Sequence, residues 1–174
     1  MNHKRQYRRQ PGRQYRRRQA GFNLIELLIV VAIIGILAAV AVPKLQENLR
    51  LGRETAAITS LRTIHNNEAQ FNAMRGKFGS LKEMQEANLL EAKYAGGTSI
   101  NQYIYKDSEV GPDAYCVHAD REGNGAGTRD FNVIEDGTIR YVSSKTKGSV
   151  PHGEGTALAS GETAPAGGAE KPKN

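Results

Sequence analysis

The amino-acid sequence predicts an α+β fold in which one long N-terminal α-helix packs against a small antiparallel β-sheet of three to four strands. Over residues 22–42 the chain is apolar apart from Asn23 and Glu26. Over residues 44–75 apolar side chains recur at helical spacing, and after residue 97 short alternating segments are separated by turn residues. We therefore expect a helix whose first half is apolar all round and whose second half is apolar on the side that packs on the sheet.

The charge of the chain is divided sharply at Gly21. The whole sequence has 24 Lys and Arg against 18 Asp and Glu, a formal charge of +6. Residues 1–21 contain eight of these cations and no acid, so the rest carries 16 − 18 = −2. A basic arm directly before an apolar segment is typical of the cytoplasmic side of a membrane-insertion signal. The arm also has Tyr7 and Tyr15 among its arginines, a pattern found in nucleic-acid binding, but its position favours the membrane role. We expect no nucleic-acid binding by the chain that follows it.

The apolar segment has the length of a membrane span. At about 1.5 Å per residue, a helix over residues 22–42 is roughly 30 Å long, which matches the hydrocarbon core of a bilayer. An ordinary secretory signal has a shorter apolar core of about 7–15 residues. A plain membrane anchor leaves Glu26 unexplained, because an ionised carboxylate in hydrocarbon costs several kcal/mol unless it has a partner.

The region around Gly21 resembles the class III signal of type IV pilins and of the related pseudopilins of type II secretion. The matching features are the Arg-rich leader, Gly21, Phe22, Leu24, Ile25 and Glu26. The resemblance implies that a prepilin peptidase cuts between Gly21 and Phe22 on the cytoplasmic side and methylates the Phe22 amine. Two departures from the family pattern are present. Asn23 replaces the usual Thr or Ser, and Gln19-Ala20 replaces a Lys or Arg before the glycine.

A cut after Gly21 gives Glu26 a physical role. The new N-terminus is an ammonium in apolar surroundings, and Glu26 lies about one helical turn further on. Staggered neighbouring helices would bring Glu26 of one subunit to the Phe22 ammonium of the next, so each buried charge gains its partner only in the assembly. Two helix-weakening residues follow. Gly35 costs roughly 1 kcal/mol relative to Ala but permits close helix approach, and Pro43 removes a backbone hydrogen bond where the membrane part gives way to the soluble part.

The second half of the long helix carries an apolar stripe. The helix is predicted to run unbroken from Phe22 to about Arg75. The stripe consists of Ile58, Leu61, Ile64 and Phe71, extended loosely by Leu45, Leu49 and Met74. A capping box at Ser80-Leu81-Lys82-Glu83 then predicts a short helix over about 81–90.

The remaining chain predicts the sheet and a tail. The candidate strands are 102–105, 114–118, 129–134 and 138–142, and Asp136-Gly137 is the strongest hairpin signal. The predicted inner face consists of Tyr103, Tyr105, Tyr115, Val117, Phe131, Val133, Ile139 and Tyr141. Residues 143–174 are rich in Gly, Ala, Ser, Thr and Pro and are predicted to be disordered.

The sequence has no positive sign of enzymatic chemistry. No nucleophile elbow, phosphate loop or dinucleotide motif occurs among its glycines. The single cysteine, Cys116, excludes an intramolecular disulfide and is predicted to be a small buried side chain. No cofactor is expected. A calcium hypothesis rests on the oxygen ligands around the 123–127 loop, whose spacing differs from an EF-hand. The resemblance also implies it, since major pseudopilins bind calcium in their C-terminal part. Its candidate ligands are Asp120, Glu122, Asn124 and Asp130.

The sequence thus predicts a structural subunit of a type IV pilus, with a pilin-like fold. The expected parts are a removable leader (1–21), a transmembrane and filament-core helix (22–42), an amphipathic helix with an α/β head (43–142) and a tail (143–174). The expected partners are copies of itself, other pilins, prepilin peptidase, an inner-membrane assembly platform and, before assembly, the lipid bilayer. The subunit is expected in the inner membrane first and in a cell-surface or periplasmic filament afterwards. The alternatives are a type II secretion pseudopilin and a membrane-tethered module whose basic arm recruits anionic lipid or nucleic acid.

Overall fold

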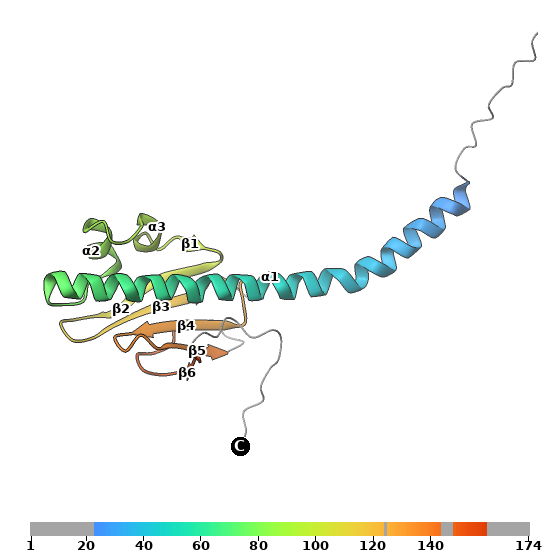
Figure 1. Ribbon diagram of the computed structural model, residues 1–174. Helices are drawn as coiled ribbons and strands as arrows, with labels where there is room; N and C mark the ends of the chain where they lie inside the picture. Colours follow the sequence, from blue (N-terminus) through green and yellow to red (C-terminus); the bar gives the residue numbers. More distant parts are fainter. Residues whose placement is uncertain (1–22, 124, 144–147, 160–174) are drawn as a thin grey trace, which may run out of the picture. The chain divides into compact units, whose positions relative to one another are not determined.

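The computed structural model describes residues 23–123, 125–143 and 148–159 and confirms the α+β fold (Figure 1). The elements are α1 (Leu24–Arg75), α2 (Leu81–Glu86), α3 (Ala92–Ala95), β1 (Ser99–Ile100), β2 (Tyr103–Val110), β3 (Tyr115–Arg121), β4 (Arg129–Ile134), β5 (Ile139–Ser143) and β6 (Thr156–Ala157). The strands form one antiparallel sheet in chain order. The chain divides into two compact units, the first ending at Val40 and the second, called the head here, beginning at Ala41.

Helix α1 carries the predicted stripe into the core of the head. Ile58, Leu61 and Ile64 are fully buried and Phe71 nearly so. The looser extension of the stripe is wrong: Leu45, Leu49 and Met74 are 59%, 49% and 60% exposed. The buried part of the helix therefore begins at Glu54 and ends at Phe71.

The predicted inner face of the sheet is confirmed. Seven of its eight residues are buried in the hydrophobic core, and Tyr141 packs against that core while partly exposed. The β4–β5 hairpin turns at Asp136-Gly137 as predicted, and the Gly137 amide donates to the Ile134 carbonyl at 2.9 Å. Gly137 has a φ of +72°, and a Cβ there would lie 2.7 Å from His65 Nε2 on α1. Glycine is thus required both by the turn and by the close approach of the helix.

Two predictions of element number and length need correction. The sheet has six strands rather than three or four, because β1 and β6 have two residues each and are too short to show an alternating pattern. The helix predicted over 81–90 ends at Glu86, and Asn88 adopts a φ of +57°. The capping box itself is confirmed, since the Ser80 side chain accepts from the Glu83 amide and the Glu83 side chain accepts from the Ser80 amide.

The predicted disordered tail also differs from the structure over residues 148–159. Val150 is 1% exposed and Leu158 is 9% exposed, and β6 pairs with β5. Two apolar side chains are enough here because side chains of the sheet bind the backbone of the segment, which composition alone cannot reveal. The rest of the predicted tail, at 144–147 and 160–174, lies outside the described residues.

A buried ion pair ties α1 to the sheet. Glu54 is 1% exposed, and its Oε1 accepts from the Thr128 amide at 2.6 Å and the Thr128 hydroxyl at 3.0 Å. Its Oε2 accepts from Arg129 Nε at 2.8 Å and Nη2 at 2.7 Å. The Arg129 carbonyl in turn accepts from the buried Tyr103 hydroxyl at 2.8 Å. A second buried pair, Arg121 with Asp130, lies on the neighbouring strands β3 and β4.

A second buried glutamate on α1 is only half paired. Glu68 is fully buried, and its Oε2 accepts from the Gly79 amide at 3.0 Å, whereas Oε1 has no partner among the described residues. Burial raises the pKa of Glu68 to about 7; the bond from Gly79 opposes this, and the charges of Asp107 and Glu83 add to it. Glu68 is therefore protonated in much of the folded population at neutral pH.

Glu54→Ala is expected to reduce the free energy of unfolding by about 3–5 kcal/mol, because it leaves the Arg129 guanidinium buried without its partner. The matched control is Glu47→Ala on the exposed part of the same helix, which is expected to change stability by less than about 0.5 kcal/mol. Denaturant unfolding of the full chain in mild detergent measures both variants. Equal, small effects would contradict the assignment of Glu54 as the anchor of α1.

Glu68→Gln is expected to flatten the pH dependence of stability. Because the folded pKa of Glu68 is raised from about 4.5 to about 7, the folded state binds the proton more tightly. The contribution of Glu68 to the free energy of unfolding is complete below pH 4.5 and is lost as the pH rises toward and through 7. Between pH 5 and pH 8 the wild type should lose about 2 kcal/mol more than Glu68→Gln. Unfolding of both chains at the two pH values checks this, with Glu47→Gln as the control, and parallel pH profiles would refute it.

Candidate assembly interface

The described part of α1 begins with a hydrogen-bonded cap at Asn23. Leu24 is the first helical residue. The Asn23 carbonyl accepts from the Glu26 amide at 3.0 Å and the Leu27 amide at 3.2 Å, and Asn23 Oδ1 accepts from the Ile25 amide at 3.4 Å. Glu26 is thus the third residue of the helix, where a carboxylate interacts favourably with the positive end of the helix dipole. Its side chain is exposed in the single chain.

The first unit presents an apolar surface on all sides of the helix. Every described residue up to Arg50 is exposed, and the large aliphatic side chains from Leu24 to Val42 are 46–77% exposed. Helix α1 is long and apolar enough to cross a membrane, with a mean hydropathy of 3.0 over its best window and none of that window buried. An apolar surface of this extent needs lipid or protein around it.

The two helix-weakening residues both lie inside α1. Gly35 lies in the first unit, and a Cβ built there meets no atom within 4 Å. A neighbouring helix can therefore approach the bare backbone at this position. Pro43 lies three residues into the head, and the helix continues beyond it to Arg75. The predicted cleavage and methylation residues, Gly21 and Phe22, lie outside the described residues.

The candidate calcium ligands have other partners in the head. Asp130 accepts three bonds from Arg121, at 2.8–3.0 Å. Asp120 accepts from the Ser149 hydroxyl at 2.8 Å, and Glu122 accepts from the Ser99 hydroxyl at 2.6 Å. Asn124 lies outside the described residues, and calcium binding stays a prediction. Within 23–123, 125–143 and 148–159, no group of three or more His, Cys, Asp or Glu side chains is placed to hold a metal ion.

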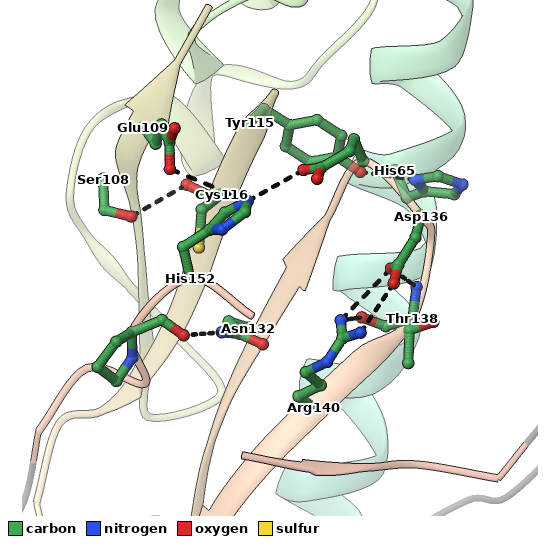
Figure 2. A network of polar contacts seen from close by, with 12 residues as sticks. His65, Ser108, Glu109, Tyr115, Cys116, Asn132, Asp136, Thr138, Arg140 and His152 are labelled. Atoms are coloured by element: carbon green, nitrogen blue, oxygen red, sulfur yellow. Dashed lines mark hydrogen bonds and ion pairs between the residues drawn. The ribbon is translucent and has the colours of Figure 1, made fainter. Parts of the chain in front are cut away.

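A short segment, residues 148–152, covers the outer face of the sheet and is called the strap here. Asn132 Nδ2 donates to the Val150 carbonyl at 3.0 Å and to the Pro151 carbonyl at 2.8 Å. His152 Nε2 lies 3.1 Å from Glu135 Oε2 and 3.9 Å from Glu109 Oε2. Figure 2 shows the Asn132 side chain directed at the strap backbone and His152 beside Glu109. The strap therefore binds through side chains of β2, β3, β4 and the residue that follows β4.

Beneath the strap lies a buried polar layer that sequence reasoning missed. Cys116, His118 and Asp120 alternate along β3 with residues of the hydrophobic core, so they occupy the opposite face of the sheet. All three are buried, and burial raises the pKa of the Cys116 thiol and lowers the pKa of His118. Cys116 is thus a buried side chain without a disulfide, as its isolation in the sequence predicted.

Comparison with known proteins places the N-terminal residues and most of the chain in one family. Residues 16–42 match the family model described as "Prokaryotic N-terminal methylation motif". A type IV major fimbrial protein of Dichelobacter nodosus is 34% identical over 138 residues, covering 73% of this chain and 83% of that protein. A fimbrial protein of Pseudomonas aeruginosa is 30% identical over 131 residues, covering 75% of this chain and 71% of that protein. The chain belongs to the type IV pilin family.

Membership of this family settles the broad class of function. The chain is a structural pilin subunit and not an enzyme, and the comparisons favour the pilus over the secretion pseudopilus. A type IV major pilin of Myxococcus xanthus is also similar, at 39% identity, over 35% of this chain and 28% of that protein. The pilin carries a prepilin processing signal, and its apolar helix is suited to membrane association before assembly with other pilins.

Asn132→Ala is expected to loosen the strap of this pilin without unfolding the head. The change removes the two bonds to the Val150 and Pro151 carbonyls and leaves the core between α1 and the sheet intact. Each such bond contributes about 1 kcal/mol, so amide exchange over residues 148–152 should become about tenfold faster or more. Thr138→Ala, on the adjoining turn, is the control. If amide exchange in the strap were unchanged in Asn132→Ala, the apolar contacts of the strap would be enough to hold it in place.

Proposed function

We propose that this pilin is cut after Gly21 by a prepilin peptidase, methylated on the Phe22 amine and stored in the inner membrane through residues 22–42. An assembly platform then extracts it into a helical filament. In that filament the N-terminal helices form the core and the heads form the outer surface. The observation that carries the proposal is the apolar first part of α1, which is exposed along its described length and has Glu26 as its one acid before Glu47.

The energetics of the transfer explain why Glu26 matters. Moving the helix from lipid into a protein bundle gains little hydrophobic free energy, since lipid is as apolar as the neighbouring helices. The assembled state must therefore be favoured by close packing, which Gly35 permits, and by polar pairing. The pairing proposed is between the Glu26 carboxylate of one subunit and the Phe22 ammonium of its neighbour, each of which is costly in hydrocarbon alone.

The same pair also selects the register between the N-terminal helices of neighbouring subunits. A neighbour shifted by one turn places two unpaired charges in apolar surroundings, which costs several kcal/mol. The stored state and the assembled state then differ in the partner of Glu26 rather than in the amount of apolar surface buried.

Removal of the leader is checked by the mass of the membrane-resident chain. The expected mass corresponds to residues 22–174 with one added methyl group. A chain that still carries residues 1–21 would refute the proposal and favour the membrane-tethered module with a basic cytoplasmic arm.

Glu26→Ala is expected to leave cleavage largely intact and to reduce incorporation into filaments by at least about tenfold, because the neighbour's ammonium loses its partner. The matched control is Glu47→Ala, an exposed glutamate on the same helix. Immunoblots of sheared surface fibres measure the assembled amount of each variant, and immunoblots of the membrane fraction measure the amount stored before assembly. Filaments built normally from cleaved Glu26→Ala would remove this role of the carboxylate.

A further inference from the structure

Among the described residues, Asn23 supplies the acceptors for three amides at the start of α1. Of the first four helical amides, those of Ile25, Glu26 and Leu27 all donate to Asn23, one to its side chain and two to its carbonyl. In water such amides can bind solvent, but next to apolar side chains in a membrane an unpaired amide is costly. The cap at Asn23 therefore has a greater effect here than at an exposed helix start.

The sequence before the cap would otherwise favour a longer helix. Residues 16–20 read Arg-Arg-Arg-Gln-Ala, and these three residue types are among the better helix formers. Gly21 opposes extension, and Asn23 opposes it further because an N-cap residue takes non-helical backbone angles while its side chain accepts from the first turn. Asn23 with Glu26 three residues later also has the spacing of a capping box, but the Asn23 side chain accepts from the Ile25 amide instead of the Glu26 amide.

The position of the cap bears on the bond that must be cut. A peptide bond within a helix has its amide and carbonyl engaged and must unfold locally before a protease can attack it. The Gly21–Phe22 bond comes one residue before Asn23 in the chain. A helix that starts at Leu24 leaves this bond outside, whereas a helix that starts several residues earlier includes it.

We propose that Asn23 is a positioning residue for processing: its cap sets the start of α1 and keeps the helix from extending through the Gly21–Phe22 bond. This inference rests on the proposed cleavage after Gly21. Asn23 acts through the backbone of the helix, so any side chain that caps can replace it. A side chain that has the same amide group but cannot reach the capping position does not replace Asn23.

The experiment compares four variants of the full chain in membrane vesicles that contain a prepilin peptidase. Asn23→Ala removes the cap, Asn23→Ser keeps a capping acceptor without the amide, and Asn23→Gln keeps the amide on a longer side chain that caps poorly. Asn48→Ala, on an exposed part of the same helix, is the control. Cleavage rates are measured across substrate concentrations by the mass of the product, and amide exchange of residues 18–27 is measured on the uncleaved chains in detergent.

The proposal expects cleavage of Asn23→Ala and Asn23→Gln to be about fivefold slower, matching the usual strength of an N-cap. Protection from exchange should spread to residues 20–22 in these two variants. Asn23→Ser and Asn48→Ala should behave as the wild type in both measurements. Normal cleavage of Asn23→Ala would overturn the inference, as would rescue by Gln but not by Ser, which would indicate recognition of the amide itself. A wild-type chain that is not cut would instead refute the proposed processing, and the exchange pattern would still decide whether Asn23 sets the helix start.

Discussion

The head of this pilin depends on burying the Glu54 carboxylate with both oxygens paired. Glu54 comes from α1, and its four bonds come from Thr128 and Arg129, two consecutive residues at the entry to β4. An ionised carboxylate in the interior is tolerated only in such a setting. A helix that slides or rotates by one residue would leave Glu54 and Arg129 buried and unpaired. The pair therefore selects one register of α1 on the sheet, and the apolar stripe from Ala57 to Phe71 fills the core once that register is set.

Three glutamates on α1 show how surroundings decide what one side chain does. Glu54 is fully paired within the chain and serves the fold. Glu68 is equally buried but has one unpaired oxygen, and its raised pKa makes it a source of pH-dependent stability. Glu26 is exposed in the single chain, and its proposed partner belongs to another subunit. The helix thus has its internal polar anchors in the head, while the acid in its apolar half has no side-chain partner among the described residues and is proposed to pair in the assembly.

The periodic parts of the fold were predictable, and the polar anchors were not. The stripe, the inner face of the sheet and the Asp136-Gly137 turn follow from apolar spacing and turn chemistry, which act locally. Glu54 and Glu68 fall on the same three- and four-residue spacing as Ile58 and Leu61, so a signal for their burial was present. It was missed because a charged residue is normally assigned to solvent, and the partner Arg129 lies 75 residues away from Glu54. At the proposed assembly site, the spacing from Gly21 singles out Glu26 in the sequence, and its role stays a prediction. The cap bond of Asn23 to the Ile25 amide is visible only in the structure, because in the sequence Asn23 is simply a departure from the Thr or Ser usual in the family.

The strap shows why composition alone wrongly predicted disorder for residues 148–159 at the C-terminal side of the head. A chain with one cysteine cannot fasten this segment by an internal disulfide, so side-chain bonds to backbone carbonyls have to hold it. Such bonds are invisible to any count of apolar residues, and two buried aliphatic side chains, Val150 and Leu158, supply the rest. Each bond contributes only about 1 kcal/mol, far less than the core beneath α1. The strap and β6 should therefore open well before the helix leaves the sheet, and changes at this face alter the outer surface of the subunit while the register set by Glu54 persists.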